Sequence, residues 1–328
     1  MKNELQGNCL IDKDILEAHK KLKWWVVPFR ITVKLAAYAA CVYFVLKPGY
    51  EYSRLILVPF MALILATCKN VAHFYIHYNL RNRKMNRVLG IFWSSLILQN
   101  FSFFKYEHLN HHRFAGVDGD TIPHKYFESF WIYIGALAGV FDWRTSFKEI
   151  SSFARNRFPG FIKTEKQKKQ IREDNVVVII WFIIVVILTI LFPKAFLLTY
   201  WLPICLAPGA FFIFAAAEHY GLNSEEDPDI AYNTRTVKSS PIVRFIQWNS
   251  NYHAEHHYFP NVPLLNLHSL SKHTNGLYYN KEKSYFHYHI KLIRSLFNNN
   301  KGLGISRSEH ESEQKSIKRP ELSVADSN

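Results

Sequence analysis

The sequence has few cysteines and no close pair of them. The four in 328 residues, Cys9, Cys41, Cys68 and Cys205, lie far apart and form no C-x-x-C pair. This spacing excludes a disulfide framework, a cysteine-based zinc site and a four-cysteine iron–sulfur cluster. Cys41 and Cys205 lie inside apolar runs, so we expect the cysteines to be small buried residues.

Acidic residues are also scarce: 26 Asp and Glu stand against 40 Lys and Arg, which gives a net charge of +14. A basic chain can bind nucleic acid, but here the charges flank apolar runs and form no nucleic-acid-reading motif, so we expect no nucleic-acid partner. The first 25 residues are too charged for a secretory signal peptide. The chain has no internal repeat of fixed period.

Long apolar runs separated by basic segments predict an all-α integral membrane protein. A helix needs roughly 20 apolar residues to cross a bilayer. Four runs approach or reach that length, at about residues 26–46, 55–71, 176–192 and 195–217. The helical pattern of the second run continues through residues 72–80, so we expect this helix to project beyond the lipid. The sequence therefore predicts four transmembrane helices.

Two further apolar stretches, residues 91–104 and 131–143, are too short for a full crossing and predict re-entrant or interfacial helices. The basic, partly amphipathic residues 144–175 predict a pair of surface helices. We expect a chain cut at about residue 300 to remain largely active. The predicted divisions are a cytosolic N-terminal segment 1–25, a membrane catalytic domain 26–283, and a polar, partly disordered C-terminal tail 284–328.

Positive charge predicts the orientation in the membrane. Lysine and arginine are concentrated before the first span and after the second, whereas the opposite face carries only Lys47, Arg54 and Lys194. By the positive-inside rule, both termini and all large loops of this multi-pass protein are cytoplasmic. The membrane is either a bacterial inner membrane or the endoplasmic reticulum.

The histidines are strongly clustered, since nine of the sixteen fall in four places next to predicted spans. "HFYIH" contributes an i, i+4 pair, "HLNHH" and "HAEHH" each contribute i, i+3, i+4 triplets, and "AEHYG" contributes a single residue. The topology brings all four places to the cytoplasmic boundary, as a helical cap. The predicted metal ligands are His73, His77, His108, His111, His112, His219, His253, His256 and His257.

The spacing has a physical meaning, because positions i, i+3 and i+4 share one face of a helix. Imidazole suits iron, copper, nickel and zinc, and nine ligands are too many for one ion, which favours two metals. A histidine-rich, pH-sensitive surface would not predict a repeated spacing. The other seven histidines lack this spacing and are interpreted as ordinary packing or surface residues.

Residues from about 30 to 275 resemble the membrane fatty-acid desaturase and hydroxylase superfamily. The resemblance is carried by the first histidine pair, by "KYEHLNHHRF" (105–114), by "AEHYG" (217–221) and by "NTRTV…RFIQWNSNYHAEHHYFPNVP" (233–263). It implies a four-span helical fold with two Fe ions held by histidines at the cytosolic face. It also implies O₂- and electron-dependent attack on an unactivated C–H bond of a lipid chain.

Such a reaction needs a cofactor, because no side-chain acid or base breaks an alkyl C–H bond. The chain has no His-Pro-Gly-Gly haem motif, so electrons would come from a separate donor of ferredoxin or cytochrome type, which the basic cytoplasmic face would attract. The ligand rings need hydrogen-bond acceptors on their other nitrogen. Candidate acceptors are Glu107, Asp118, Asp120, Glu218 and Glu255, and candidate organisers of the site are Arg113, Arg235 and Asn251.

Three functions remain open. The first is a fatty-acid or acyl-lipid desaturase. The second is a lipid or carotenoid hydroxylase or ketolase, which would use the same ligands and differ only in the fate of the substrate radical. The third is a metal transporter or sensor, which is disfavoured because a transporter needs polar groups in mid-membrane, whereas residues 176–192 offer only Thr189.

Overall fold

The computed structural model describes residues 11–49, 51–77, 80, 82–122, 127, 129–222, 229–274, 276–298 and 303–304. These residues form an all-α architecture, apart from two short strands, and this confirms the predicted fold class. Four helical units are long and apolar enough to cross a membrane. They are α2 (Val26–Leu46), α3 with α4 (Arg54–Ala66, Cys68–Ile76), α9 (Glu165–Leu191), and α10 with the π-helical turn η2 and α11 (Pro193–Phe196, Leu197–Trp201, Leu202–His219).

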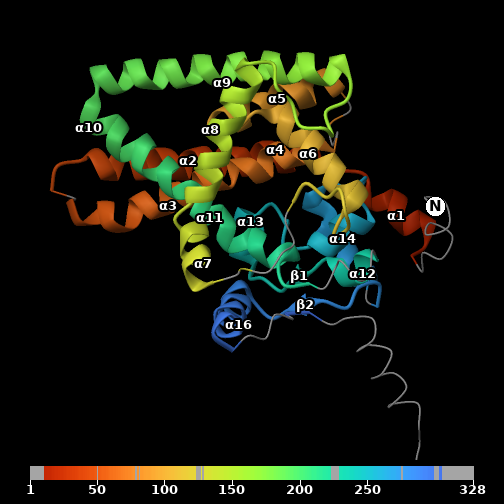
Figure 1. Cartoon of the computed structure of the whole chain (residues 1–328). Coiled ribbons are helices and arrows are strands. Elements are labelled where there is room, and N and C mark those ends of the chain that lie inside the picture. The colour runs from red at the N-terminus through yellow and green to blue at the C-terminus, as the bar shows by residue number, and fades with distance from the viewer. Residues whose placement is uncertain are drawn as a thin grey trace, which may run out of the picture.

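The two hairpin turns that join these helices lie at the same end of the molecule. Figure 1 shows the turn between α2 and α3 and the turn between α9 and α10 together at the left, whereas α12 and α14 lie to the right of them. The end of α4 and the end of α11, which carry histidines, both point away from these turns. The topology therefore brings His73 and His219 to one end, as the order of spans predicts.

The outer faces of the long helices are apolar and exposed. On α9, Ile180, Ile187 and Ile190 expose 52%, 50% and 75% of their surface. A soluble protein rarely exposes a contiguous apolar face of this kind. Lipid is the environment that such a surface requires, and the chain is therefore a membrane protein.

The cysteines follow the same division between inner and outer faces. Cys41 and Cys68 are buried, as expected, but Cys205 is exposed, and that expectation was wrong. Its neighbours Leu202 and Leu206 are also exposed, at 42% and 48%. An apolar run in a membrane helix has an outer face as well as an inner one, so position in the run does not predict burial. Cys9 lies outside the described residues.

The two short apolar stretches fold as helix–turn–helix pairs. The first pair is α5 (Arg83–Ser95) and α6 (Phe101–Phe114), and the second is α7 (Phe130–Leu137) and α8 (Val140–Ala154). Asn100 begins α6, since its side chain accepts a hydrogen bond from the backbone N–H of Phe103. Gly139 separates α7 from α8 with φ of +70°, a value that glycine adopts without strain.

Helix α6 is fixed to the polar beginning of α9 by a small buried network. The Asp174 carboxylate accepts from Arg87 at 2.6 Å and from the backbone N–H of Ser102 at 2.8 Å. The amide of Asn100 donates to the carbonyl oxygen of Ile171 at 2.8 Å. Asp174 is 1% exposed, whereas Arg87 remains 31% exposed. This network orients the helix that carries three of the clustered histidines.

We expect Asp174→Asn to lower the free energy of unfolding by about 2 kcal/mol, because the buried one of the two carboxylates that pair with Arg87 loses its charge. The value lies below the roughly 3–5 kcal/mol of a fully buried pair, since Arg87 is partly solvated. Unfolding by SDS titration in mixed micelles measures the change. Glu173→Gln is the matched control: Glu173 also pairs with Arg87, at 3.0 Å, but its side chain is 47% exposed, so an equal loss in the control would contradict the prediction.

The remaining elements form the cap around the histidine-bearing ends. Two parallel two-residue strands, β1 (Thr236–Val237) and β2 (Lys281–Glu282), form the sheet. The other cap elements are α1 (Lys13–His19), α12 (Ile230–Asn233), α13 (Pro241–Ile246), α14 (His253–Tyr258), η3 (Leu264–Asn266), α15 (Leu267–Leu270), η4 (Ser271–His273) and α16 (Tyr285–Asn298).

The C-terminal region contributes to the packed structure, which the sequence analysis did not predict. Helix α16 buries Tyr285, Tyr288 and Leu292, and the Tyr288 hydroxyl donates to the carbonyl oxygen of Ala216 in α11 at 2.8 Å. Leu303 is 8% exposed and its N–H donates to the Gly221 carbonyl at 2.9 Å. The rest of the tail that was predicted to be partly disordered, residues 299–302 and 305–328, lies outside the described residues.

These contacts revise the expected effect of truncation. We expect a chain ending at residue 300 to be less stable than one ending at residue 304 by about 1.5–3 kcal/mol, the value for burying one leucine side chain. Comparing the two lengths by SDS titration isolates the contribution of residues 301–304. Equal stability of the two would show that Leu303 packs without stabilising the fold.

Candidate metal centre

The nine predicted ligands lie together in two groups. Within each group the candidate ligand nitrogens all lie within 4.8 Å of one another. Both groups consist of histidines alone in the part of the chain that the structure describes. The five-histidine group is His73, His77, His108, His112 and His256, and the four-histidine group is His111, His219, His253 and His257.

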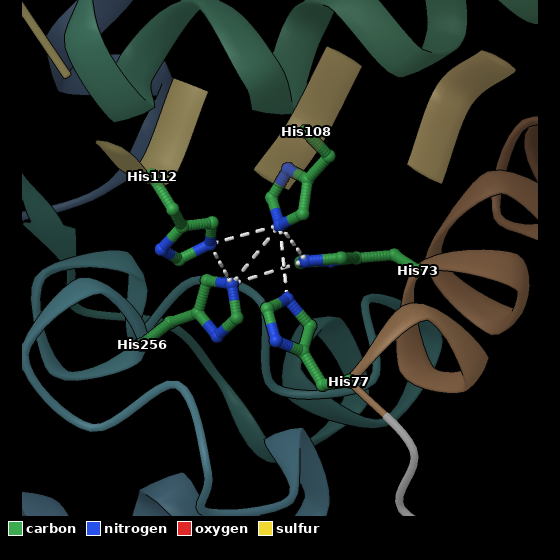
Figure 2. Close-up of side chains that lie close together, drawn as sticks. All are labelled: His73, His77, His108, His112 and His256. Carbon is green, nitrogen blue, oxygen red and sulfur yellow. Dashed lines mark hydrogen bonds between the residues drawn. The ribbon is translucent and has the colours of Figure 1, made fainter. Parts of the chain in front are cut away.

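The Nε2 atoms of the five-histidine group point toward a common centre, as Figure 2 shows. His73 Nε2 lies 2.7 Å from His108 Nε2 and 3.0 Å from that of His256. His112 Nε2 lies 2.9 Å from each of the same two atoms. His77 Nε2 completes the set at 3.0 Å from His108.

The four-histidine group forms a closed ring of Nε2 atoms. His111 lies 3.1 Å from His219 and 3.2 Å from His257. His253 closes the ring, at 2.7 Å from His219 and 3.0 Å from His257. Three separate helices, α6, α11 and α14, supply these rings.

The nitrogen spacings suit metal coordination. With the 2.0–2.1 Å bond that imidazole forms to zinc-sized ions, neighbouring ligand atoms stand about 2.9 Å apart at right angles and about 3.4 Å apart at tetrahedral angles. Most of the contacts above lie within or close to this range. Convergent Nε2 atoms cannot all donate to one another, and each group fits a shared cation.

The two triplets divide between the groups in the same way. His108 and His112, at i and i+4, enter one group, while His111 at i+3 enters the other. In α14, His253 and His257 belong to the four-histidine group, whereas His256 belongs to the five-histidine group. On a helix, position i+4 lies about 40° to one side of position i and position i+3 about 60° to the other side. Each triplet therefore contributes to both groups.

Burial favours the neutral form of an imidazole, which is the form that binds metal. Seven of the nine are buried and the other two are half-buried. Burial lowers the pKa of His77 to about 4. Burial, followed by the neighbouring imidazoles, lowers the pKa values of His108, His112, His256 and His257 well below the usual range.

Hydrogen bonds on the outer nitrogens orient rings of the four-histidine group. His219 Nδ1 donates to the Asn233 carbonyl oxygen at 2.9 Å, which leaves a lone pair on the inward Nε2. His111 Nδ1 lies 2.8 Å from a carboxylate oxygen of Asp120. Glu218 stands farther off, 3.7 Å from His253 Nδ1. The Asn233 carbonyl was missed, because a backbone group leaves no signal in the sequence.

Other predicted supporting residues have different partners. Glu255 accepts from the hydroxyls of Thr236 and Tyr278 and thereby fixes α14 to the cap. Arg235 donates to backbone carbonyl oxygens, and Asn251 donates to the Val237 carbonyl. Asp118 and Arg113 are exposed, and Glu107 lines the cavity described below.

Strand β1 connects two of the helices that carry ligands. The N–H of Arg235, which precedes β1, donates to the carbonyl oxygen of Glu218 at the end of α11, at 3.0 Å. The N–H of Val237 donates to the carbonyl oxygen of Asn251, just before α14, at 2.9 Å. Two short connections of this kind fix His219 relative to His253.

We expect Asp120→Asn to reduce metal affinity about 10- to 100-fold, the usual cost of losing a partner of a ligand histidine. The amide offers one acceptor oxygen where the carboxylate has two near His111 Nδ1, at 2.8 and 3.1 Å. Metal analysis after equilibration with a chelator measures the affinity. Asp118→Asn makes the same change at an exposed carboxylate two residues away and should leave the affinity unchanged.

Comparison with known families agrees with this geometry. The family model described as fatty acid desaturase matches residues 52–289, which is most of the chain and includes all nine histidines. The chain belongs to the fatty acid desaturase family. A search of the curated proteins found no match for this desaturase chain. Membership implies an oxidoreductase associated with a membrane and with lipid, and the histidine groups of this desaturase indicate a metal centre.

A cavity of about 670 Å³ adjoins the centre of the desaturase. Its wall includes His73 and His108 of the five-histidine group and His111, His219 and His253 of the other. A volume of this size suits a small-molecule substrate. The cavity therefore lies against both groups.

One side of this cavity is polar, which was not predicted from the sequence. Asp142 and Glu149 of α8 line it, and burial raises the pKa of Glu149 to about 8 and that of Glu107 to about 7. A partial signal was present, since Asp142, Thr145, Ser146 and Glu149 stand at i, i+3, i+4 and i+7 within α8. The basic residues around them suggested a surface helix instead.

Proposed function

We propose that this desaturase holds two Fe ions, one in each histidine group, and oxidises the hydrocarbon chain of a lipid. The product of the proposed reaction is an alkene. The observation that supports it most directly is the convergence of nine imidazole nitrogens in two adjacent groups at metal-binding spacings. Iron suits imidazole ligands, and family membership adds a lipid substrate.

The bound iron would supply the O₂-derived oxidising power that no side chain has. The residues of the chain have other tasks. His219 and His111 present neutral Nε2 atoms because their Nδ1 atoms are held by Asn233 and Asp120. The buried rings exclude water from the metal side, and the cavity aligns the substrate chain beside them.

The proposed topology has four membrane crossings, with both termini and both histidine groups in the cytoplasm. The apolar length of the four helical units supports it, as does the excess of Lys and Arg next to the histidine-bearing ends. Electrons would come from a separate ferredoxin- or cytochrome-type donor, which the net charge of +14 favours if the donor is acidic.

Lipid profiling tests the proposal. The chain is expressed in a host of known lipid composition, with a His111→Ala variant as the inactive control, and total lipids are analysed by mass spectrometry. We expect a species that has lost two hydrogens, and purified protein that contains iron. A product that has gained an oxygen would show that the reaction is hydroxylation and not desaturation. Metal flux into vesicles without a lipid product would show that the protein is a transporter and not an enzyme.

A further inference from the structure

Helix α16 carries an apolar stripe in addition to the face that packs against the rest of the protein. The packed face consists of Tyr285, Tyr288 and Leu292, which are at most 8% exposed. The stripe begins and ends with phenylalanines that expose 77% and 68% of their surface, and the two isoleucines between them are half-buried. Its members recur at i, i+4, i+7 and i+11, which is one line along a helix: Phe286, Ile290, Ile293 and Phe297.

A basic stripe runs beside the apolar one, displaced by one residue and therefore by about 100° around the helix. It consists of His287, Lys291, Arg294 and Asn298. The carboxylate of Glu282 in β2 pairs with Lys291 at 3.1 Å and with His287. Residues 278–298 contain four lysines or arginines and only this one acidic residue, so the surface keeps a net positive charge.

A helix with exposed aromatic residues on one side and basic residues on the next is typical of a helix that lies in a membrane surface. Its apolar side then enters the acyl boundary, and its basic side meets the phosphates of the headgroups. In water, the same apolar stripe would be an exposed hydrophobic patch. The pattern of α16 therefore fits a lipid surface better than solvent.

The position of α16 along the spans fits this environment. His289 Nε2 donates to the carbonyl oxygen of Ile213 in α11 at 2.8 Å. Ile213 lies six residues before His219, where α11 ends, which corresponds to about 9 Å along the helix axis. An interfacial helix buries its apolar face roughly 5–10 Å into the boundary between headgroups and acyl chains. Helix α16 thus packs against the last turns of a span, at the depth of that boundary.

The lipid-facing surface of α11 leads towards α16. Leu202, Leu206 and Ile213 lie at i, i+4 and i+11 on one face of α11 and expose 42%, 48% and 39% of their surface. Helix α7 crosses the same face at Gly209, where an added Cβ would lie 1.8 Å from the carbonyl oxygen of Leu137. The outer surface at this level therefore belongs to α7.

Helix α7 connects the exposed surface of α11 with the stripe of α16. Trp131 and Ile134 of α7 expose 77% and 37% of their surface. The ring of Phe130 lies 5.8 Å from that of Trp131 and 5.5 Å from that of Phe297 in α16, measured between centroids. Figure 1 shows α7 and α16 next to each other at the edge of the molecule. The apolar surface that lipid covers on the spans thus continues over α7 to α16.

We propose that α16 is a membrane-surface anchor that binds the anionic headgroups of the cytoplasmic leaflet. The apolar stripe lies in the acyl boundary, while Lys283 and Arg294 contact the headgroup phosphates. The occupant is lipid because the stripe continues a surface that lipid already covers. The inference goes beyond the proposed reaction and rests only on the proposed topology, in which the histidine-bearing ends of the spans are cytoplasmic.

Fluorescence quenching tests the position of the helix. The label NBD is attached to Phe286→Cys or Phe297→Cys in a chain that carries Cys9→Ser and Cys205→Ser, so that the two buried cysteines stay unlabelled. The iron-loaded full chain is placed in nanodiscs of phosphatidylcholine and phosphatidylglycerol. We expect lipids with a nitroxide on the acyl chain to quench both labels, and aqueous iodide to quench them little. Ala18→Cys, exposed on α1 and far from α16 in Figure 1, is the control and should show the reverse.

The charge is tested by comparing nitroxide-labelled phosphatidylglycerol with nitroxide-labelled phosphatidylcholine, each at the same fraction of the lipid. We expect the anionic lipid to quench the label of Phe297→Cys about fivefold more effectively, the effect of roughly one basic residue near an anionic surface. Lys283→Gln combined with Arg294→Gln should make the two lipids nearly equal. Lys13→Gln combined with Lys21→Gln removes two exposed lysines elsewhere in the cap and should preserve the preference.

Iodide quenching of both α16 labels would place the stripe in water and overturn the inference. Protection from both quenchers would overturn it as well, because it would show that protein covers the stripe. An unchanged lipid preference after loss of Lys283 and Arg294 would reject the headgroup contact. Iron content and lipid products measured on the same samples keep the two proposals separate, since the quenching does not depend on turnover.

Discussion

Replacing His256 with alanine is expected to abolish turnover and to remove at least the metal of the five-histidine group. His256 Nε2 lies 2.9 Å from His112 Nε2 and 3.0 Å from His73 Nε2, and the ring is 1% exposed, so water does not easily take its place. Losing a partner of a ligand already costs about 10- to 100-fold, and losing the ligand itself should cost more. Iron per chain and product formation are measured together.

His268→Ala provides the control, since His268 is outside both groups and contacts Arg244 and Tyr252. It should keep its iron and most of its activity. The alanine variant of His256 must also retain the helical circular dichroism of the parent chain. If it does so and remains fully active, the assignment of the five-histidine group as a ligand set is wrong.

Arg235→Ala is expected to lower the free energy of unfolding by about 3–5 kcal/mol, because several buried acceptors lose their donor at once. The side chain is 2% exposed and donates to the carbonyl oxygens of Ala217 at 2.7 Å, Tyr220 at 3.2 Å and Leu303 at 3.3 Å. Its guanidinium also lies 4.9 Å from the ring centroid of Tyr288. SDS titration measures the loss.

The same variant should lose iron from the four-histidine group, since Arg235 holds the end of α11 where His219 lies. The stability of Arg235→Lys is expected to lie between that of the parent chain and that of Arg235→Ala, because an ammonium lacks the planar fork that reaches several carbonyls. Arg155→Ala removes an exposed arginine that bonds only within its own helix turn and should change stability little. A stable, iron-loaded Arg235→Ala chain would show that the hydrogen bonds of Arg235 are dispensable.

The spans were predictable because the bilayer imposes a length and a composition. The run 26–46 corresponds to α2, and the continuation of the second run through His73 corresponds to α4. Helix α16 was not predicted, since aromatic and basic residues alternate in it without a long apolar run. Its burial depends on α11, which is distant in sequence.

The clustered histidines were predictable from their spacing and from the order of the spans. Their division into five and four was not predicted, although helix geometry contains it: i+3 and i+4 lie on opposite sides of position i. The backbone acceptor at Asn233 and the packing that turns the polar side of α8 inward depend on tertiary contacts. No local pattern reports such contacts.

Helices α6 and α14 each serve both histidine groups. The orientation of α6 or α14 therefore cannot be changed for one group alone, because a rotation of either helix that improves one set of rings displaces the other. Substitutions that tune one ion in isolation must instead be sought on α4, whose rings enter only the five-histidine group, or on α11, whose single ring enters only the four-histidine group.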